Sequence, residues 1–121
     1  MAEHILTRSL TLDIPREEAF AFFADAANLE RITPPALGFH IVTAQPIGIR
    51  QGTLIDYELK MHGIPMKWQT EITVWEPPFR FVDKQLRGPY SQWIHTHTFT
   101  EAGPSQTVIG DEVLYRLPFE P

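Results

Sequence analysis

Two histidines and one aspartate in the last third of the chain have the types and spacing to do chemistry. His95 and His97 alternate within an extended run, so both rings point to one face of a strand. Asp111 lies in the next extended run, and the link between the runs carries Gly103-Pro104, so the two runs should form an antiparallel hairpin. A carboxylate beside a histidine fixes the tautomer of the ring, which can then accept or donate a proton.

Two registers of this hairpin fit the sequence. In one register His95 lies opposite Asp111, and in the other, shifted by two residues, His97 lies opposite Asp111. Either register places the carboxylate beside a histidine, on a face that also carries Trp93 and Tyr115. This face is too polar for a plain core and too aromatic for a plain surface, so it predicts the wall of a pocket.

A metal site is the first alternative to acid–base chemistry. The His95-x-His97 pair, with Glu101 four residues later, resembles the first metal motif of the cupins, and imidazole and carboxylate suit a divalent transition metal. The second cupin motif needs a later histidine, and none follows His97. We therefore expect no metal and no other cofactor. The other histidines, which could supply a ligand only if the fold brought them near, are His4, His40 and His62.

Length and composition indicate one folded domain over residues 1–121, because 43% of the residues are hydrophobic and 21% are charged. The net charge of −5 and the lack of a basic stripe argue against nucleic-acid binding. With no cysteine the chain has neither disulfides nor thiolate metal sites. It shows no signal peptide and no apolar run long enough to span a membrane, so we expect a cytoplasmic protein.

The first part of the chain, up to Ile32, predicts one strand and two short helices. Residues 4–13 alternate as a strand, and Pro15 then fixes a first helical turn. Phe23 belongs to the apolar face of this helix. Asp25 can cap a second helix that ends near Ile32, because the two prolines that follow cannot continue it.

Everything after residue 37 alternates with the period of a strand. In the run around Trp68, for example, Thr70, Ile72 and Val74 share the face of the indole and polar residues take the other face. Glycine and proline pairs separate the runs. The strands expected from this pattern are 39–44, 53–61, 66–75, 79–87, 90–99 and 107–115.

A family resemblance rests on one long motif and a shorter one. They are Phe81-x-Asp83-x-Gln85-x-x-Gly88-Pro89-Tyr90-x-x-Trp93-x-His95-x-His97-x-Phe99, and Thr107 followed by Asp111-x-Val113-x-Tyr115 and Leu117-Pro118. With them, the chain resembles the START-like, helix-grip (SRPBCC) superfamily, which includes polyketide cyclase/dehydrase-like proteins, plant pathogenesis-related allergens and lipid-transfer domains. The resemblance implies an α+β helix-grip fold, in which a curved antiparallel seven-stranded sheet wraps around a long C-terminal helix and encloses a hydrophobic cavity.

One departure from that superfamily is large. The long C-terminal helix is absent, since the sequence stops at Pro121 just after the last expected strand. We expect either a chain truncated at its C-terminus or some other cover for the concave face of the sheet. An uncovered apolar face tends to associate, so self-association into a homo-oligomer, or an unusually open groove, is expected as well.

The resemblance and the residues together predict binding of a small hydrophobic or aromatic molecule on the concave face. One alternative is a cyclase or dehydratase that uses His95 or His97 with Asp111 for acid–base catalysis, and another is an interaction domain that pairs through the uncovered face. The polar residues could instead form a satisfied network that only specifies the packing. The expected ligand-binding residues are Phe23, Tyr57, Trp68, Phe81, Asp83, Gln85, Trp93 and Tyr115.

Overall fold

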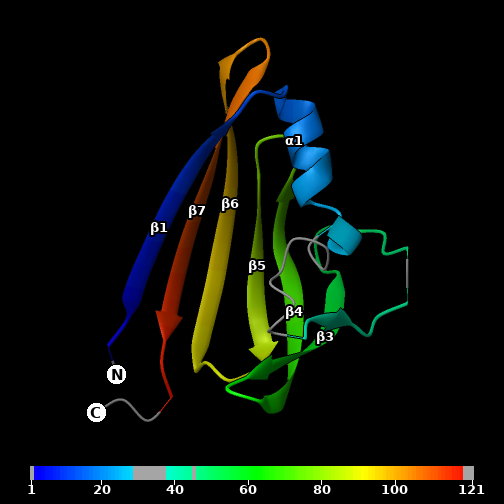
Figure 1. The fold of residues 1–121 in the computed structure, drawn as a ribbon, viewed down its shortest axis with the longest axis vertical. Coiled ribbons are helices and arrows are strands. Elements are labelled where there is room, and N and C mark those ends of the chain that lie inside the picture. Colours follow the sequence, from blue (N-terminus) through cyan, green and yellow to red (C-terminus); the bar gives the residue numbers. More distant parts are fainter. Residues whose placement is uncertain (1, 29–37, 45, 119–121) are drawn as a thin grey trace.

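The computed structural model describes residues 2–28, 38–44 and 46–118, and its strands form one antiparallel sheet in the order β1-β7-β6-β5-β4-β3-β2 (Figure 1). The seven strands and the helical segment between the first two confirm the α+β class. The elements are β1 (His4–Leu12), α1 (Arg16–Phe23), β2 (His40–Ile41), β3 (Leu54–Met61), β4 (Ile64–Glu76), β5 (Arg80–Arg87), β6 (Gln92–Gly103) and β7 (Gln106–Arg116).

The sheet is curved, and α1 lies at the end of it where β6 turns into β7 (Figure 1). Phe20 fixes the helix there, because its ring packs against Phe81 and Phe99 with centroids 5.8 and 5.1 Å away. Ala19 and Phe20 are buried, as are the residues that they cover on the sheet. Thr107 ties β7 to the start of the helix, since its Oγ1 donates to the carbonyl of Ile14 at 2.8 Å.

A second helical segment starts where the sequence predicts it. The main-chain N–H of Ala27 donates to Oδ1 of Asp25 at 3.0 Å, and residues 26–28 are helical. Asp25 therefore caps this segment as expected. Its predicted end near Ile32 lies outside the described residues.

Of the two registers predicted for β6 and β7, the structure has the one with His97 opposite Asp111. His97 pairs with Asp111, and Trp93 pairs with Tyr115. Side chains of directly opposed residues share a face, so the imidazoles, the carboxylate and the aromatic rings all lie on the concave side. The face predicted for the functional side chains is the one observed.

The strand predicted over residues 39–44 is too long. The ladder with β3 covers only His40 and Ile41, because the N–H groups of Val42 and Thr43 both donate to the carbonyl of Asp56. Two donors on one acceptor break the alternation that a regular ladder needs. The chain therefore leaves the sheet after Ile41.

A β-bulge in β4 makes one further prediction wrong. Ile72 pairs with Asp83 and Val74 with Val82, so Thr73 is an extra residue with no partner of its own on β5. The extra residue changes which side chains face inward. Trp75, not Val74, lies on the concave side, where its ring is 5.1 Å from that of Phe20 and 5.7 Å from that of Phe81.

Candidate functional site

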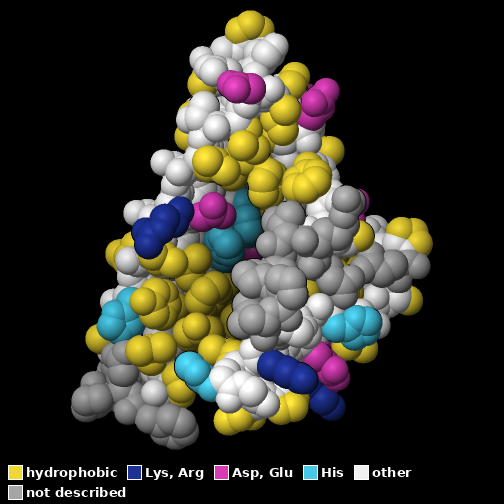
Figure 2. Space-filling model, viewed as in Figure 1, with side chains coloured by type: hydrophobic (Ala, Val, Ile, Leu, Met, Phe, Trp, Pro, Cys, Tyr) yellow, Lys and Arg dark blue, Asp and Glu magenta, His cyan; other side chains and the backbone are white. Residues whose placement is uncertain are grey.

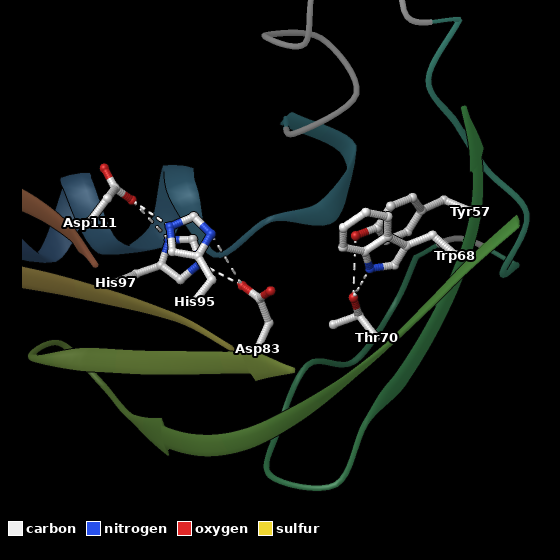
Figure 3. Close-up of polar contacts among 7 residues, drawn as sticks. All are labelled: Tyr57, Trp68, Thr70, Asp83, His95, His97 and Asp111. Carbon is white, nitrogen blue, oxygen red and sulfur yellow. Dashed lines mark hydrogen bonds and ion pairs between the residues drawn. The ribbon is translucent and has the colours of Figure 1, made fainter. Parts of the chain in front are cut away.

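The histidines stack on each other between two aspartates. The rings of His95 and His97 lie 3.7 Å apart and 24° from parallel. Nε2 of His95 is 2.8 Å from Oδ1 of Asp111, and Nε2 of His97 is 2.6 Å from Oδ2 of Asp83 (Figure 3). These four residues are called the histidine cluster below.

Each carboxylate of the histidine cluster also approaches the second ring. Nδ1 of His97 is 3.5 Å from Oδ1 of Asp111, and Nδ1 of His95 is 4.0 Å from Oδ2 of Asp83. An ionised carboxylate only accepts hydrogen bonds, so Nε2 of each ring donates and Nδ1 of a neutral ring keeps its lone pair. The hydrogen bond from His95 lowers the pKa of Asp111 below its ordinary value and outweighs the opposing effect of burial.

Aromatic rings hold the histidine cluster in place. Phe81 stacks on His97 with centroids 4.1 Å apart, and the ring of Trp93 stands edge-on to His95 at 6.4 Å. The side chains of Asp83, His95 and His97 are only 17, 22 and 16% exposed, whereas that of Asp111 is 38% exposed. The cluster is thus half-buried, with Asp111 on its outer side.

A second polar group lies farther along the same face of the sheet. Nε1 of Trp68 donates to Oγ1 of Thr70 at 3.0 Å, and the hydroxyl of Tyr57 lies 3.2 Å from the same oxygen (Figure 3). Thr70 is only 3% exposed. These three residues are called the threonine cluster below, and each of their side-chain polar atoms has a partner within it.

Burial in the threonine cluster keeps the phenol of Tyr57 neutral. Loss of solvent raises its pKa far above the ordinary value, and the negative charge of Asp83 adds to the rise. The hydrogen bond with Thr70 opposes this shift without cancelling it. Tyr57 therefore offers a neutral hydroxyl, because both burial and the nearby carboxylate of Asp83 disfavour its ionised form.

A pocket of about 250 Å³ reaches from one cluster to the other. Apolar side chains form most of its wall, and its polar side chains belong to the two clusters. Figure 2 shows histidine side chains at the bottom of a hollow in the middle of this face, with hydrophobic side chains around it. Representative apolar residues of the wall are Phe39, Ile41, Ile55, Leu59 and Ile72.

The pocket brings together most of the residues that the sequence proposes for the site. Its lining contains His95, His97 and six of the eight expected ligand-binding residues. Whether these side chains bind a ligand stays a prediction. The six are Phe23, Tyr57, Trp68, Phe81, Asp83 and Trp93.

Gln85, Asp111 and Tyr115 do not line the pocket. Gln85 instead closes the turn after β5. Its Nε2 donates to the carbonyl of Tyr90, and its Oε1 accepts from the N–H of Tyr90. A side chain at Gly88 would overlap that amide, which explains the glycine. Tyr115 stacks on His4 at 5.1 Å, and Asp111 lies outside the lining, where it approaches the rings of both His95 and His97.

Sequence reasoning did not include Thr70 or Leu59 in the site, although both line the pocket. The sequence pattern could have identified both residues. Thr70 lies two residues after Trp68 and Leu59 two residues after Tyr57, so in a strand each pair shares a face. A hydroxyl at an inward position of an apolar strand face needs a buried partner, and in this case the partners are an indole and a phenol.

The cupin-like grouping of His95, His97 and Glu101 is not formed. Glu101 pairs with Arg16 at 3.3 Å, near the start of α1. The acidic residue beside both rings is Asp83, which comes from the neighbouring strand β5.

The described helices include none that is long and apolar enough to cross a membrane.

The overall fold matches several solved structures closely. The aromatase/cyclase ZhuI from Streptomyces sp. R1128 has a TM-score of 0.78 at 14% identity, over 99% of this chain and 72% of that one. A START superfamily protein from Mycobacterium smegmatis has a TM-score of 0.74 at 11% identity, over 98% and 81%. No family model and no curated protein matches the sequence.

A third match is norcoclaurine synthase from Thalictrum flavum in complex with dopamine and hydroxybenzaldehyde. Its TM-score is 0.73 at 14% identity, over 96% of this chain and 70% of that one. At these identities the matches establish the fold alone. They confirm the START-like helix-grip fold that the sequence predicts.

Proposed function

We propose that the protein binds a small, largely apolar aromatic molecule in the pocket between the two clusters. The observation that carries this proposal is an apolar pocket whose polar groups gather at two places, the histidine cluster and the threonine cluster. Ligand pockets typically combine a hydrophobic wall with a few placed polar groups that orient the guest. The START-like fold supports a hydrophobic ligand in general terms.

The size of the pocket favours a ligand of one or two rings. Its volume of about 250 Å³ lies just below the range of roughly 300–1,000 Å³ that is common for drug-sized molecules. Trp68 and Trp93 offer flat apolar surfaces, and Nδ1 of a neutral His95 or His97 can accept a hydrogen bond from a ligand hydroxyl. The aromatic molecules in the norcoclaurine synthase complex belong to the same size class.

A calorimetric titration with naphthol in the presence of a chelator tests binding. We expect the substitution Leu59→Trp, which fills the pocket, to weaken affinity by about tenfold or more, or about 1.4 kcal/mol. Ile64→Trp is the matched control, because Ile64 is 58% exposed and does not line the pocket. Equal affinities for the two variants would contradict the proposal.

Native mass spectrometry of freshly purified protein separates this function from pairing through the sheet. A retained small molecule on a monomer supports ligand binding. A dimer without a small molecule would favour the interaction domain, to which the exposed Leu6 and Leu10 on β1 would contribute.

The cytoplasmic location expected from the sequence also stays a prediction, which cell fractionation can test.

Acid–base catalysis of the cyclase or dehydratase type is the second candidate. The observation that favours it is the pairing of each Nε2 with a carboxylate, which leaves Nδ1 of a neutral ring as a base. Elimination of water from an aryl-substituted β-hydroxy ketone, followed by absorbance of the enone, tests it. With His95→Gln and His97→Gln, turnover should vanish while affinity stays within about tenfold. Unchanged turnover would exclude a catalytic role for these rings.

A further inference from the structure

We propose that the histidine cluster binds a divalent transition-metal ion, with Asp83, His95 and His97 as its ligands. Each of these side chains offers one donor atom, and the donor atoms lie within 4.8 Å of one another. The three residues come from the paired strands β5 and β6, so the backbone that carries them is held by the sheet. The sequence-based expectation of no metal rested on a missing histidine, whereas the third donor here is a carboxylate.

The donor set determines which ions would bind. Two imidazoles and one carboxylate suit zinc, cobalt, nickel or iron, and they suit magnesium or calcium poorly, because those ions prefer oxygen ligands. Half-burial of all three side chains lowers competition from bulk water. The histidine cluster is therefore matched to a transition metal by chemistry as well as by position.

The separations between the donor atoms come close to those of a tetrahedral metal site. Metal–ligand bonds of about 2.0–2.2 Å place neighbouring donors of a tetrahedral site about 3.3 Å apart. Oδ2 of Asp83 lies 2.6 Å from Nε2 of His97 and 4.0 Å from Nδ1 of His95, so the two separations bracket that value. All three donor atoms lie within 4.8 Å of one another, so side-chain adjustments on the order of 1 Å would bring them around one ion.

Asp111 occupies the place of an outer partner. Its Oδ1 faces Nε2 of His95 at 2.8 Å and Nδ1 of His97 at 3.5 Å, which are the two nitrogens that point away from Asp83. When the other two nitrogens bind an ion, these two carry hydrogens and donate to Asp111. A carboxylate behind a ligating histidine fixes its tautomer and raises its basicity. Asp111 is thus a positioning residue that serves both rings.

Three protein ligands leave a coordination position for water or for an oxygen of a pocket ligand. All three ligands line the pocket, so that position is accessible to a guest molecule. The ion would bind whether or not an organic molecule is present. When the metal binds Nε2 of a neutral His97, the proton that this nitrogen now shares with Asp83 is exchanged through solvent to Nδ1, so the ring stays neutral and no net proton is released.

Titration of tag-free, chelator-treated protein with zinc chloride in a calorimeter tests the site, and cobalt absorption reports its geometry. We expect one ion per chain in the wild type. Asp83→Asn and His97→Gln should each weaken zinc binding by about 100-fold or more, and Asp111→Asn by about 10- to 100-fold. Asp111→Asn should also change the cobalt spectrum, which a purely structural role would leave unchanged.

His62→Asn is the matched control. His62 is exposed in the turn between β3 and β4 at a positive φ of 53°, a conformation that asparagine tolerates. Its zinc affinity should equal that of the wild type. Binding that survives Asp83→Asn and His97→Gln in folded protein, or no binding to the wild type, would overturn the site. Because naphthol binding is measured with chelator and zinc binding without naphthol, either proposal can fail alone.

Discussion

The histidine cluster and the threonine cluster lie on the same concave face, yet they are built differently. In the threonine cluster one buried hydroxyl satisfies an indole and a phenol, and no member carries a charge. In the histidine cluster four ionisable side chains face one another and remain partly exposed. A neutral, closed network specifies packing, whereas clustered ionisable groups can exchange protons or ligands. We infer that the threonine cluster, besides lining the pocket, chiefly serves stability, whereas the histidine cluster chiefly serves function.

Removal of Trp68 should have the largest effect on stability. The indole is buried and contacts the rings of Tyr57, Tyr90 and Trp93. Trp68→Ala should lower the free energy of unfolding by about 3–5 kcal/mol, because it leaves a large cavity. Urea denaturation measures this loss. A loss below about 1 kcal/mol would show that the threonine cluster does not support the fold.

Thr70→Val should give the next largest effect. It keeps the shape of the side chain but removes the shared acceptor, so the indole N–H of Trp68 and the hydroxyl of Tyr57 lose a partner. We expect a loss of about 1–3 kcal/mol in the free energy of unfolding. Thr70→Ser, which keeps the hydroxyl, should recover most of it. Equal losses in the two variants would assign the effect to packing instead.

Tyr57→Phe should cost only about 1 kcal/mol at neutral pH, because Thr70 still accepts from Trp68. Its main effect should appear in alkali. Folded Tyr57 keeps its proton above the ordinary tyrosine pKa of about 10, whereas the unfolded chain releases it, so wild-type stability falls as pH rises past that value. Tyr57→Phe should fall less steeply between about pH 10 and pH 11 in thermal denaturation. Parallel curves would contradict the burial of this phenol.

His97→Gln should change stability least, by less than about 1 kcal/mol, because its side chain is partly exposed and the amide still donates to Asp83. It should nevertheless weaken zinc binding by about 100-fold or more. This pairing of a small structural effect with a large functional effect is the reverse of that expected for Thr70→Val. Thermal denaturation with and without zinc compares the two variants, and similar behaviour would erase the distinction between the clusters.

Much of the fold follows from local patterns. Alternation along each run, with glycine and proline pairs between the runs, predicts the seven strands because a half-buried strand has a period of two. The same parity places Trp93, His95 and His97 on one face, which explains why the pocket wall was predictable. Parity also left two registers open for Asp111, since a shift of two residues keeps every side chain on its face.

What could not be predicted depends on pairing between distant segments. The contact of Asp83 with both rings requires the register of β5 against β6, which no local pattern specifies. Gln85 has inward parity but satisfies the turn at Tyr90 instead. The bulge at Thr73 carries no glycine or proline signal, so the inward position of Trp75 was missed.

Thr73 divides β4 into two stretches that could be redesigned independently. Before it, even-numbered residues such as Trp68 and Thr70 face the ligand space, and after it the odd-numbered Trp75 faces the helix-packed core. Deleting this single residue would leave Ile72, Val74 and Trp75 opposite Asp83, Val82 and Phe81 in regular succession, so the indole of Trp75 would stay inward. Position 73 should therefore accept many substitutions, and even its loss should keep the inward side chains of both stretches on their face.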